Sequence, residues 1–475
     1  MMEFSSSTDF SLESFVITPH VGDKVEVKKL IAAFNYSESI TSPFLTATAQ
    51  IVDSVGLINT LPIKGGEMVQ VKVLTTISEE PFVYNMKIWQ VGNRFAEQKK
   101  QVYTLGLISE EAITNETAQV TVGTTGNPYS IIGNSIRTDL KSNKEVFGEN
   151  SLFEVKMLPG LKRPFDFFTS LAIRSVSPQA SFQSSGSENT NKTEQEIKGS
   201  GGFFFWETYR GYNFYAVDSL LADEKSKFKS PKLKTEAWGT APYQAYTERL
   251  GNIGDGGDDR FTIKRSVFGS EINLMEALRK GKLSSKVAFF NHSTGQYSEY
   301  VYRLRDSYDN MSHLGGQAIL SKVPLDGDNQ LSDYPSRTLS VLLDHETWFN
   351  EPGVASPEPE DGSSEPTPYA DWQKYYTVQT ISRYQLLQNQ KCTIVIPGNA
   401  EMCAGDRINI RLISKLPDEL AKDEPYDLES SGEYLIGEVT HQYDPTMGSN
   451  GTFLTTLRLM RDSYGMKGKA SVHST

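Results

Sequence analysis

The chain has 475 residues, of which 38% are hydrophobic and 11% aromatic, and its formal net charge is −12. This length predicts about three domains at roughly 150 residues each. The aromatic content excludes a disordered chain, and no stretch approaches the ~20 apolar residues of a membrane-spanning helix. The acidic balance argues against a protein that binds nucleic acid tightly through its phosphates.

Only Cys392 and Cys403 occur, so a disulfide framework cannot hold this fold. The amino terminus has neither a basic nor an apolar stretch, so we expect the mature chain to begin there and to be made in a reducing compartment.

Residues 1–118 alternate between apolar and polar side chains, the pattern of strands that are buried on one face. Proline and glycine turns separate the apolar runs. At least five strands are predicted, at 25–27, 44–52, 69–73, 84–88 and 102–107. Many short antiparallel strands in about 110 residues predict a small barrel or sandwich.

Residues 119–238 differ in character and predict a small α+β insertion domain. Asn127 and Pro128 should open one helix, as N-cap and first helical residue, and Pro164 should open another. Apolar residues recur at helical spacing in both: Ile132, Ile136 and Leu140 in the first, and Phe165, Phe168, Leu171 and Ala172 in the second. After them we expect an exposed loop at 183–200, a β-hairpin of 203–206 with 212–215, and a linker with five lysines at 225–234.

Residues 239–475 return to strand patterns and predict a second barrel. Strands are expected near 260–268 and 286–304, and helices at about 270–280, ended by Gly281, and about 372–390. An acidic, proline-rich insertion at about 320–371 interrupts the pattern. Within it, residues 344–371 hold eight acids, five prolines and no lysine or arginine, so they cannot build a core. The net charge is −5 for 1–118, +2 for 119–238 and −9 for 239–475, so much of the acidity is local.

The chain contains an internal repeat. Residues 66–73 align with 405–412 in the pattern glycine, acid, any residue, then alternating aliphatic and polar residues. Each copy is followed by a long predicted hairpin, 82–91 with 100–109 in the first case and 433–443 with 451–460 in the second. Two matches in the same order suggest related barrels. The predicted fold class is therefore mainly β, with two tandem related tube-type β-barrels, 1–118 and 239–475, and a small α+β domain.

No catalytic, cofactor-binding or metal-binding residues are predicted. The six histidines and two cysteines form none of the spacings typical of zinc ligands. Residues 344–346 (Asp-His-Glu) lie at the start of the acidic segment, and residues 254–259 lack the alternating ligands of a calcium loop. The glycines at 199–202 precede a strand rather than a helix, so they offer no phosphate loop. A long chain of strands without such a motif favours an assembly or binding protein over an enzyme.

Several short stretches, none of them a catalytic signature, are spread over most of the chain. They are 34–40, 51–54 and 61–67 near the start, the aromatic hairpin 203–220, and 434–441 followed by 453–460, which come after the helix at 372–390 and a strand at 392–396. Together with the order of barrel, insertion and second barrel, they resemble the central hub of T-even-like phage baseplates and the hub part of VgrG spike proteins. The segments 183–200 and 344–371 look longer than in that family.

This resemblance implies a structural hub in the virion tail, made in the cytoplasm of the host bacterium. It implies a homotrimer, in which two tube domains per chain give six similar units, matching a sixfold tail tube above and a threefold spike below. The implied partners are the chain itself, the central spike protein, the tail tube or tube-initiator proteins and, as a further candidate, the tape measure protein. Genomic DNA would only pass through, because an acidic wall does not hold phosphates. No cofactor is implied.

Two other functions remain open. A carbohydrate-binding or adhesion protein would expose the aromatic residues Trp206, Tyr209, Tyr212 and Trp238 along a groove, whereas a β-hairpin core would bury them. A polysaccharide-degrading enzyme would need a converging pair of carboxylates, one of them with a raised pKa. No such pair can be singled out among the 59 acids.

Overall fold

The structure, a computed structural model, describes residues 6–61, 63–76, 78, 80–97, 100–183, 196–222, 245–248, 259–269, 273–291, 295, 297–316, 324–326, 329–343, 369–415, 426–448 and 450–465. The described chain is mainly β, as the sequence predicts, and most strand pairs are antiparallel. Both cysteines are buried, and they do not form a disulfide with each other. None of the described helices combines the length and the apolarity that a membrane crossing requires.

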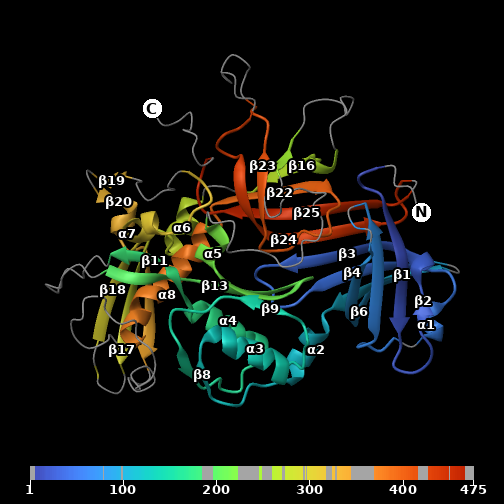
Figure 1. Ribbon diagram of the computed structural model, residues 1–475, viewed down its shortest axis with the longest axis horizontal. Coiled ribbons are helices and arrows are strands. Elements are labelled where there is room, and N and C mark those ends of the chain that lie inside the picture. The colour runs from blue at the N-terminus through green and yellow to red at the C-terminus, as the bar shows by residue number, and fades with distance from the viewer. Residues whose placement is uncertain are drawn as a thin grey trace.

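The amino-terminal strands form one half of a large sheet (Figure 1). In spatial order they run β3, β4, β7, β6, β5, β1 and β2, with antiparallel neighbours. Alternate residues point into one core, so Val69, Val71 and Val73 are buried. The elements are β1 (Phe10–Thr18), β2 (Val25–Glu26), a 3₁₀ turn (Lys28–Leu30), β3 (Ile31–Ser39), β4 (Thr46–Asp53), α1 (Leu57–Thr60), β5 (Met68–Thr75), β6 (Phe82–Glu97) and β7 (Lys100–Ile108).

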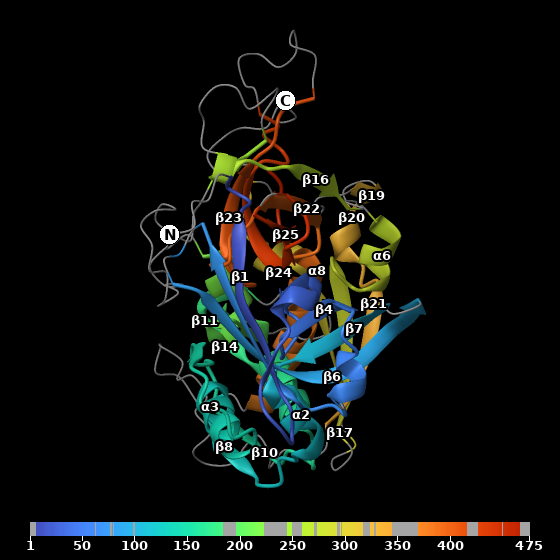
Figure 2. The same cartoon turned by 90° about the vertical axis from the view of Figure 1, so that its right-hand side faces the viewer.

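The carboxy-terminal strands form the other half, in the spatial order β16, β22, β25, β24, β23 and β15. Their core is separate and includes Ile408, Ile410 and Leu412. Because β24 also pairs with β3, the two halves make one continuous sheet. Figure 2 shows the first half below the second. The strands are β15 (Ala245–Thr247), β16 (Arg265–Phe268), β22 (Gln390–Pro397), β23 (Arg407–Arg411), β24 (Gly432–Asp444) and β25 (Thr452–Arg461).

Both halves follow the same plan. In chain order, β15, β16, β22, β23, β24 and β25 occupy the places that β1, β3, β4, β5, β6 and β7 occupy in the first half. The two predicted long hairpins are β6–β7 and β24–β25, and each is interrupted by a register shift just after an isoleucine, Ile88 or Ile436. One difference is that β15 runs parallel to β23, whereas β1 is antiparallel to β5. The internal repeat is therefore confirmed, and we call these halves the first and second repeats.

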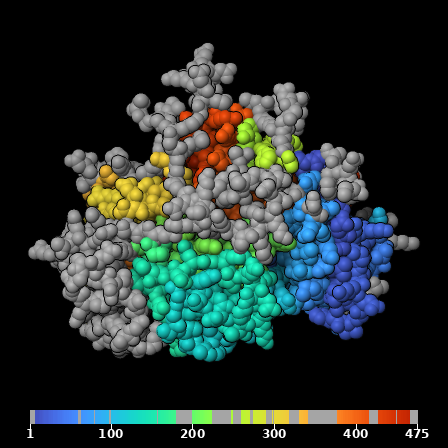
Figure 3. Space-filling view, in the orientation of Figure 1, coloured from blue at the N-terminus to red at the C-terminus, as the bar shows by residue number. Residues whose placement is uncertain are grey.

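Between the repeats, the described residues from 110 to 222 form a helical lobe, coloured cyan to green in Figure 3. Both predicted helices are confirmed: Asn127 caps α3 by accepting from the Tyr129 N–H, and the expected apolar residues are buried in one core. The elements are α2 (Glu110–Thr117), β8 (Thr124–Gly126), α3 (Pro128–Thr138), β9 (Val146–Gly148), β10 (Val155–Met157), α4 (Pro164–Arg174), β11 (Val176–Gln183), β12 (Glu196–Gly201), β13 (Phe203–Thr208), β14 (Gly211–Ala216) and α5 (Val217–Leu221).

A second insertion lies inside the second repeat, between β16 and β22, where the first repeat has only the short turn between β3 and β4. Its centre is a sheet in the order β18, β17, β21, against which α8 packs (Figure 1). The elements are α6 (Leu274–Arg279), β17 (Ser284–Asn291), β18 (Tyr297–Arg303), α7 (Leu304–Ser307), β19 (Pro324–Asp326), β20 (Asn329–Gln330), β21 (Arg337–Leu343) and α8 (Tyr369–Leu386), with 3₁₀ turns at Tyr308–Asn310 and Leu331–Asp333. A further 3₁₀ turn, Asp259–Phe261, precedes β16.

Several expected boundaries were wrong. The strands β1 and β3 were missed, because a register shift after Leu12 breaks the alternation of β1 and because β3 buries an acid, Glu38. At 25–27 the structure has only the two-residue β2.

Part of the expected loop at 183–200 is the polar strand β12, which pairs with β11. The expected helix at 270–280 is shorter, starting at an Asn273 cap, and α8 starts and ends earlier than 372–390. The lysine-rich linker and most of the acidic insertion lie outside the described residues.

Candidate functional site: the interface between the repeats

The two repeats meet where β3 pairs with β24, which we call the repeat interface: residues 34–39 lie antiparallel to 438–443. On its buried side, Tyr36 stacks on His441 with ring centroids 5.9 Å apart. The hydroxyl oxygens of Tyr84 and Tyr443 lie 2.8 Å apart. Burial lowers the pKa of His441 to about 3 and raises the pKa values of both tyrosines, so these rings are neutral near pH 7. The interface thus combines a backbone ladder with uncharged aromatic packing.

Glu38 is the one acid of β3 that points into this interface. Its Oε1 accepts hydrogen bonds from the Tyr36 hydroxyl (2.7 Å) and the Tyr209 N–H (2.6 Å). Its Oε2 accepts from the Ala404 N–H (3.0 Å). These donors belong to the first repeat, the helical lobe and the second repeat respectively, so one carboxyl group contacts all three. Burial raises the pKa of Glu38 to about 7, because these hydrogen bonds only partly offset the loss of water.

Arg210, in the turn between β13 and β14, reaches from the helical lobe to the second repeat. Its two terminal nitrogens bind the two oxygens of Asp406 at 2.8 and 2.9 Å, and one of them also donates to the Glu401 carbonyl. Both side chains are about one-tenth exposed. Burial disfavours the charged guanidinium, but the adjacent carboxylate outweighs this and raises the pKa of Arg210. The bidentate pair therefore fixes the tip of the hairpin on the second repeat.

Asp406 belongs to the turn that recurs in the sequence, and the two copies of this turn have the same backbone geometry. The N–H of Gly66 donates to the Ile88 carbonyl at 2.6 Å, and that of Gly405 donates to the Ile436 carbonyl at 2.8 Å. Both glycines have positive φ, +87° and +92°, which side chains rarely adopt. This conformation explains why glycine stands at both positions.

The acids of the two turns are satisfied differently. Glu67, in the first repeat, accepts hydrogen bonds from the N–H groups of Lys64 (2.7 Å) and Gly65 (2.9 Å), within its own turn. Asp406 accepts from the Cys403 N–H (3.0 Å) in the same way, but also binds Arg210. The turn of the second repeat therefore also binds the helical lobe, through the Arg210–Asp406 ion pair.

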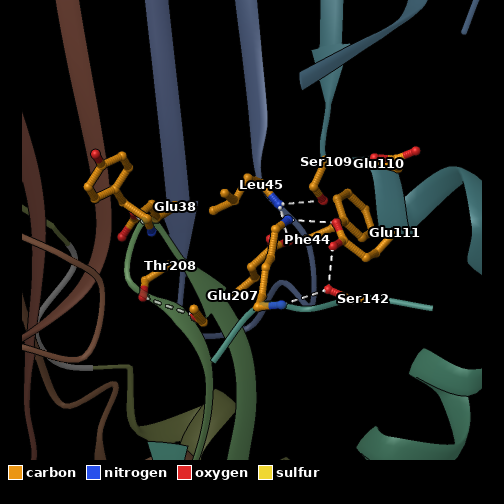
Figure 4. Close-up of polar contacts among 12 residues, drawn as sticks. Glu38, Phe44, Leu45, Ser109, Glu110, Glu111, Ser142, Glu207 and Thr208 are labelled. Carbon is orange, nitrogen blue, oxygen red and sulfur yellow. Dashed lines mark hydrogen bonds and ion pairs between the residues drawn. The ribbon is translucent and has the colours of Figure 1, made fainter. Parts of the chain in front are cut away.

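A second polar contact joins the helical lobe to the first repeat (Figure 4). Lys144 binds Glu111 at 2.6 Å and Glu207 at 2.5 Å, and Glu207 also accepts from the Leu45 N–H at 3.2 Å. Burial raises the pKa of Glu207, whereas Lys144 outweighs the burial of Glu111 and lowers its pKa. The two acids share one cation, and Glu207 also contacts the first repeat through the Leu45 N–H.

A third contact is deeper. Arg383 of α8 is fully buried and binds Asp218 of α5 at 2.9 Å and Asp462, next to the end of β25, at 3.1 Å. Asp462 also lies 2.7 Å from Nδ1 of His313, whose Nε2 lies 2.6 Å from the Tyr308 carbonyl. Both nitrogens of His313 thus lie within hydrogen-bond distance of an oxygen atom. Burial opposes the charge of Asp462, but these donors outweigh it and lower its pKa.

Of the residues considered for chemistry, those that the structure describes do not form a site. Trp206 and Tyr212 are fully buried in two different hydrophobic clusters, and Tyr209 is partly exposed beside Glu38. Trp238 and the Asp-His-Glu at 344–346 lie outside the described residues, as does all of 254–259 except Asp259. Among the described residues, no three acids, histidines or cysteines are placed to hold a metal ion. In the described part of the chain, the carboxyl groups with raised pKa values are Glu38 and Glu207, and both are buried in contacts between parts of the chain.

The sequence predicted the acids of the two turns but not the residues that bind them. The repeat identified Glu67 and Asp406 as equivalent acids, but nothing in the sequence named Arg210 as the partner of Asp406. The turn Arg210-Gly211 was predicted only as a hairpin tip. Glu38 and Arg383 were missed because their partners are far away in the sequence. Tyr209 and Asp218, respectively, are each more than 160 residues from them.

No protein-family model matches the chain, and no curated protein matches it in sequence. Among solved structures it is similar to the tail protein from Neisseria meningitidis MC58 (TM-score 0.49, 11% identity, 96% of this chain and 97% of that one). It is also similar to the 43 kDa tail protein of prophage MuSo2 from Shewanella oneidensis (0.44, 9%, 95% and 98%). A third is the E. coli c3393 protein, a type VI secretion component described as similar to the T4 tail proteins gp27 and gp5 (0.38, 9%, 97% and 79%).

These are tail and secretion-system proteins of the class that the sequence resembles. At these TM-scores and identities they say nothing about the activity of this chain.

Proposed function

We propose that this chain is the structural hub of a contractile tail baseplate. As a homotrimer, it adapts the sixfold tail tube to the threefold central spike and forms part of the channel through which DNA is ejected. It acts by assembly rather than by catalysis, and it resides in the virion tail after synthesis in the host cytoplasm.

The observation that carries this proposal is the placement of the two repeats. They share one strand order, and they lie side by side in one continuous sheet through β3 and β24. A chain with two similar units in a row gives six units when three copies close around an axis. This is what the family resemblance requires of a hub between sixfold and threefold neighbours.

The side chains on the exposed face of the sheet at the repeat interface are compatible with the proposed passage of DNA. Its side chains, which alternate with the buried ones, are mostly hydroxyls and amides: Asn35, Ser37, Thr46, Thr48, Gln50, Thr440, Gln442 and Thr456. The charged residues Glu438 and Arg458 on this face pair with each other at 2.7 Å. A wall of this kind offers few cations to phosphates and would not retain DNA.

The remaining details belong to the same proposal. The repeats are two tube-type barrels within 1–118 and 239–475, and 119–238 is the insertion domain. The central spike binds below, and tail tube or tube-initiator proteins bind above, with the tape measure protein as a further candidate. No cofactor takes part.

The carbohydrate-binding alternative loses two of its four aromatic residues, because Trp206 and Tyr212 are core residues. The enzyme alternative has no open carboxylate pair among the acids with raised pKa values in the described part of the chain. We therefore favour neither.

The test is an image of the assembled particle in which this chain carries a small tag. The proposal predicts three copies in a ring on the tail axis, between tube and spike. A tag found at the tail fibres, or absent from particles, would refute it. A mass measurement in solution adds the copy number, and purified chain that binds saccharide as a monomer would favour the adhesion alternative.

A further inference from the structure

Lys282 is a buried lysine that none of the contacts described above uses. It lies between α6 and β17 in the second insertion, and it is only 6% exposed. A lysine normally keeps its charged group in water or pairs it with an acid, because an uncompensated buried charge is costly. Within the described part of the chain, no acid forms an ion pair with Lys282 or offsets its burial. The fold therefore holds this amine where its charged form is disfavoured.

The main chain of Lys282 is fixed from two sides. Its N–H donates to the Ala277 carbonyl at 2.9 Å, which closes the end of α6 over Gly281, a glycine with a φ of +73°. Its carbonyl accepts from the Ser382 hydroxyl of α8 at 2.5 Å. Because both backbone groups are bonded, the chain cannot carry the side chain out to water without breaking these contacts.

Several cations surround this end of α6. Arg337 donates to the Lys280 carbonyl at 3.2 Å, and the acid of α6, Glu276, is bound to Lys280 at 2.5 Å. Lys391, in β22, acts electrostatically on both Lys282 and Glu276. Burial, with a smaller contribution from Lys391, lowers the pKa of Lys282 to about 8. At pH 7 about one-tenth of this amine is then neutral, against less than about one-thousandth for an ordinary lysine.

From the burial of this side chain and the cations around it, we propose that Lys282 reacts reversibly with carbon dioxide to form a carbamate. The lone pair of the neutral amine attacks the carbon atom of CO₂ and forms an N–C bond. One C–O π bond breaks, and its electron pair stays on the oxygen as a carboxylate charge. The nitrogen releases one proton to water, and nothing is oxidised or reduced. We commit to CO₂ because it is small, and an exposure of 6% leaves little room for a larger acyl or phosphoryl donor.

The reaction reverses the charge at this position. Lys282 belongs to the second insertion and Lys391 to the second repeat, so a repulsion between two cations becomes an attraction between an anion and a cation. Lys391 is available for this role, because its Nζ lies 3.2 Å from the neutral side-chain oxygen of Gln388 and forms no ion pair with a described acid. The inference goes beyond the proposed function and does not depend on it.

The test exposes the full chain to carbon-13-labelled bicarbonate at about pH 8, traps carbamates by ethylation with a trialkyloxonium salt and locates them by peptide mass spectrometry. The expected result is a trapped carbamate on Lys282, at least about tenfold above any other lysine. The α-amino group of the chain, whose ordinary pKa is about 8, is the positive control. Lys280 is the matched negative control, since its side chain is 43% exposed and bound to Glu276.

Three variants test the assignment and the role of the neighbouring charge. Lys282→Arg should remove the corresponding carbon-13 NMR signal of the untrapped protein and leave the signal of the α-amino group, with circular dichroism as the folding control. Lys391→Gln should reduce the label on Lys282 about threefold or more, because the anion loses its counter-charge and the pKa of the amine rises. Lys391→Arg keeps the charge and should keep the label.

A chain in which the α-amino group is labelled and Lys282 is not would overturn the inference, as would equal labelling of Lys280 and Lys282. Equal labelling of Lys282 in the natural chain and in Lys391→Gln would overturn the role of Lys391. These results leave the proposed function standing, which fails separately if tagged chain is missing from the tail axis.

Discussion

The two repeats share a plan but stabilise their buried acids in different ways. In the first repeat, Asp53 and Glu67 are held by backbone N–H groups of their own turns. In the second repeat, Asp406 and Asp462 are bound by arginines from other parts of the chain, Arg210 and Arg383. Acids of the first kind stabilise a local turn, whereas those of the second kind tie distant segments together. The second repeat is thus the one whose acids bind arginines of the insertions, whereas the first repeat contacts the helical lobe through hydrogen bonds of Glu38 and of the Leu45 N–H.

The largest effect in this comparison is expected for Asp462→Asn, which leaves the fully buried Arg383 with one carboxylate fewer. Breaking a buried ion pair costs about 3–5 kcal/mol, so the free energy of unfolding should fall by about that amount. Chemical denaturation measures it. The matched control is Asp53→Asn, which removes only backbone hydrogen bonds and should cost about 1 kcal/mol. Equal losses in the two variants would contradict the distinction between the repeats.

Arg210→Met should have the next largest effect, because it leaves Asp406 without its cation. The pair is slightly exposed, so we expect a loss of about 2–3 kcal/mol. Arg210→Lys keeps the charge but not the two-pronged geometry and should recover part of this loss. Urea unfolding gives the energies, and faster hydrogen exchange in β13 and β14 would show that the hairpin tip is released. A methionine variant as stable as the natural chain would show that the pair does not hold the lobe.

Glu38 provides a test through pH. Burial raises its pKa from the ordinary value of 4.5 to about 7, so the folded chain binds this proton more tightly than the unfolded chain. The stabilisation is complete below about pH 4.5 and is lost as the pH rises through about 7, a change of about 3 kcal/mol. Glu38→Gln should flatten this part of the stability profile. Because the amide cannot satisfy all three donors, the slope and not the absolute stability is the readout. An unchanged slope would mean that Glu38 does not titrate in this range.

The smallest effect is expected for Glu67→Gln in the first repeat. Its hydrogen bonds lie within one turn, so the loss should be about 1 kcal/mol. Hydrogen exchange should increase in β5 and β6 but not in the β13–β14 hairpin. If exchange in the hairpin also increased, the Glu67 turn would be tied to the helical lobe as the Asp406 turn is, and the comparison would fail.

Much of the fold could be predicted because it depends on local patterns. Alternation identified β5, the two long hairpins and the equivalence of Val69, Val71 and Val73 with Ile408, Ile410 and Leu412. Cap residues and helical spacing identified α3 and α4. Alternation failed for β3, where Glu38 occupies a buried position, since a buried acid looks like a surface residue in the sequence.

The length of the chain predicted about three domains. Its acidic charge predicted a protein that does not bind nucleic acid tightly. The sequence by itself determined that the chain is mainly β, that it contains a repeat and that glycine begins each copy, because side-chain periodicity and backbone conformation are local properties. Only the tertiary structure decided that the repeats share one sheet, that Arg210 binds Asp406 and that Lys282 is buried. These depend on residues that lie far apart in the chain, and burial, not local preference, selects their partners.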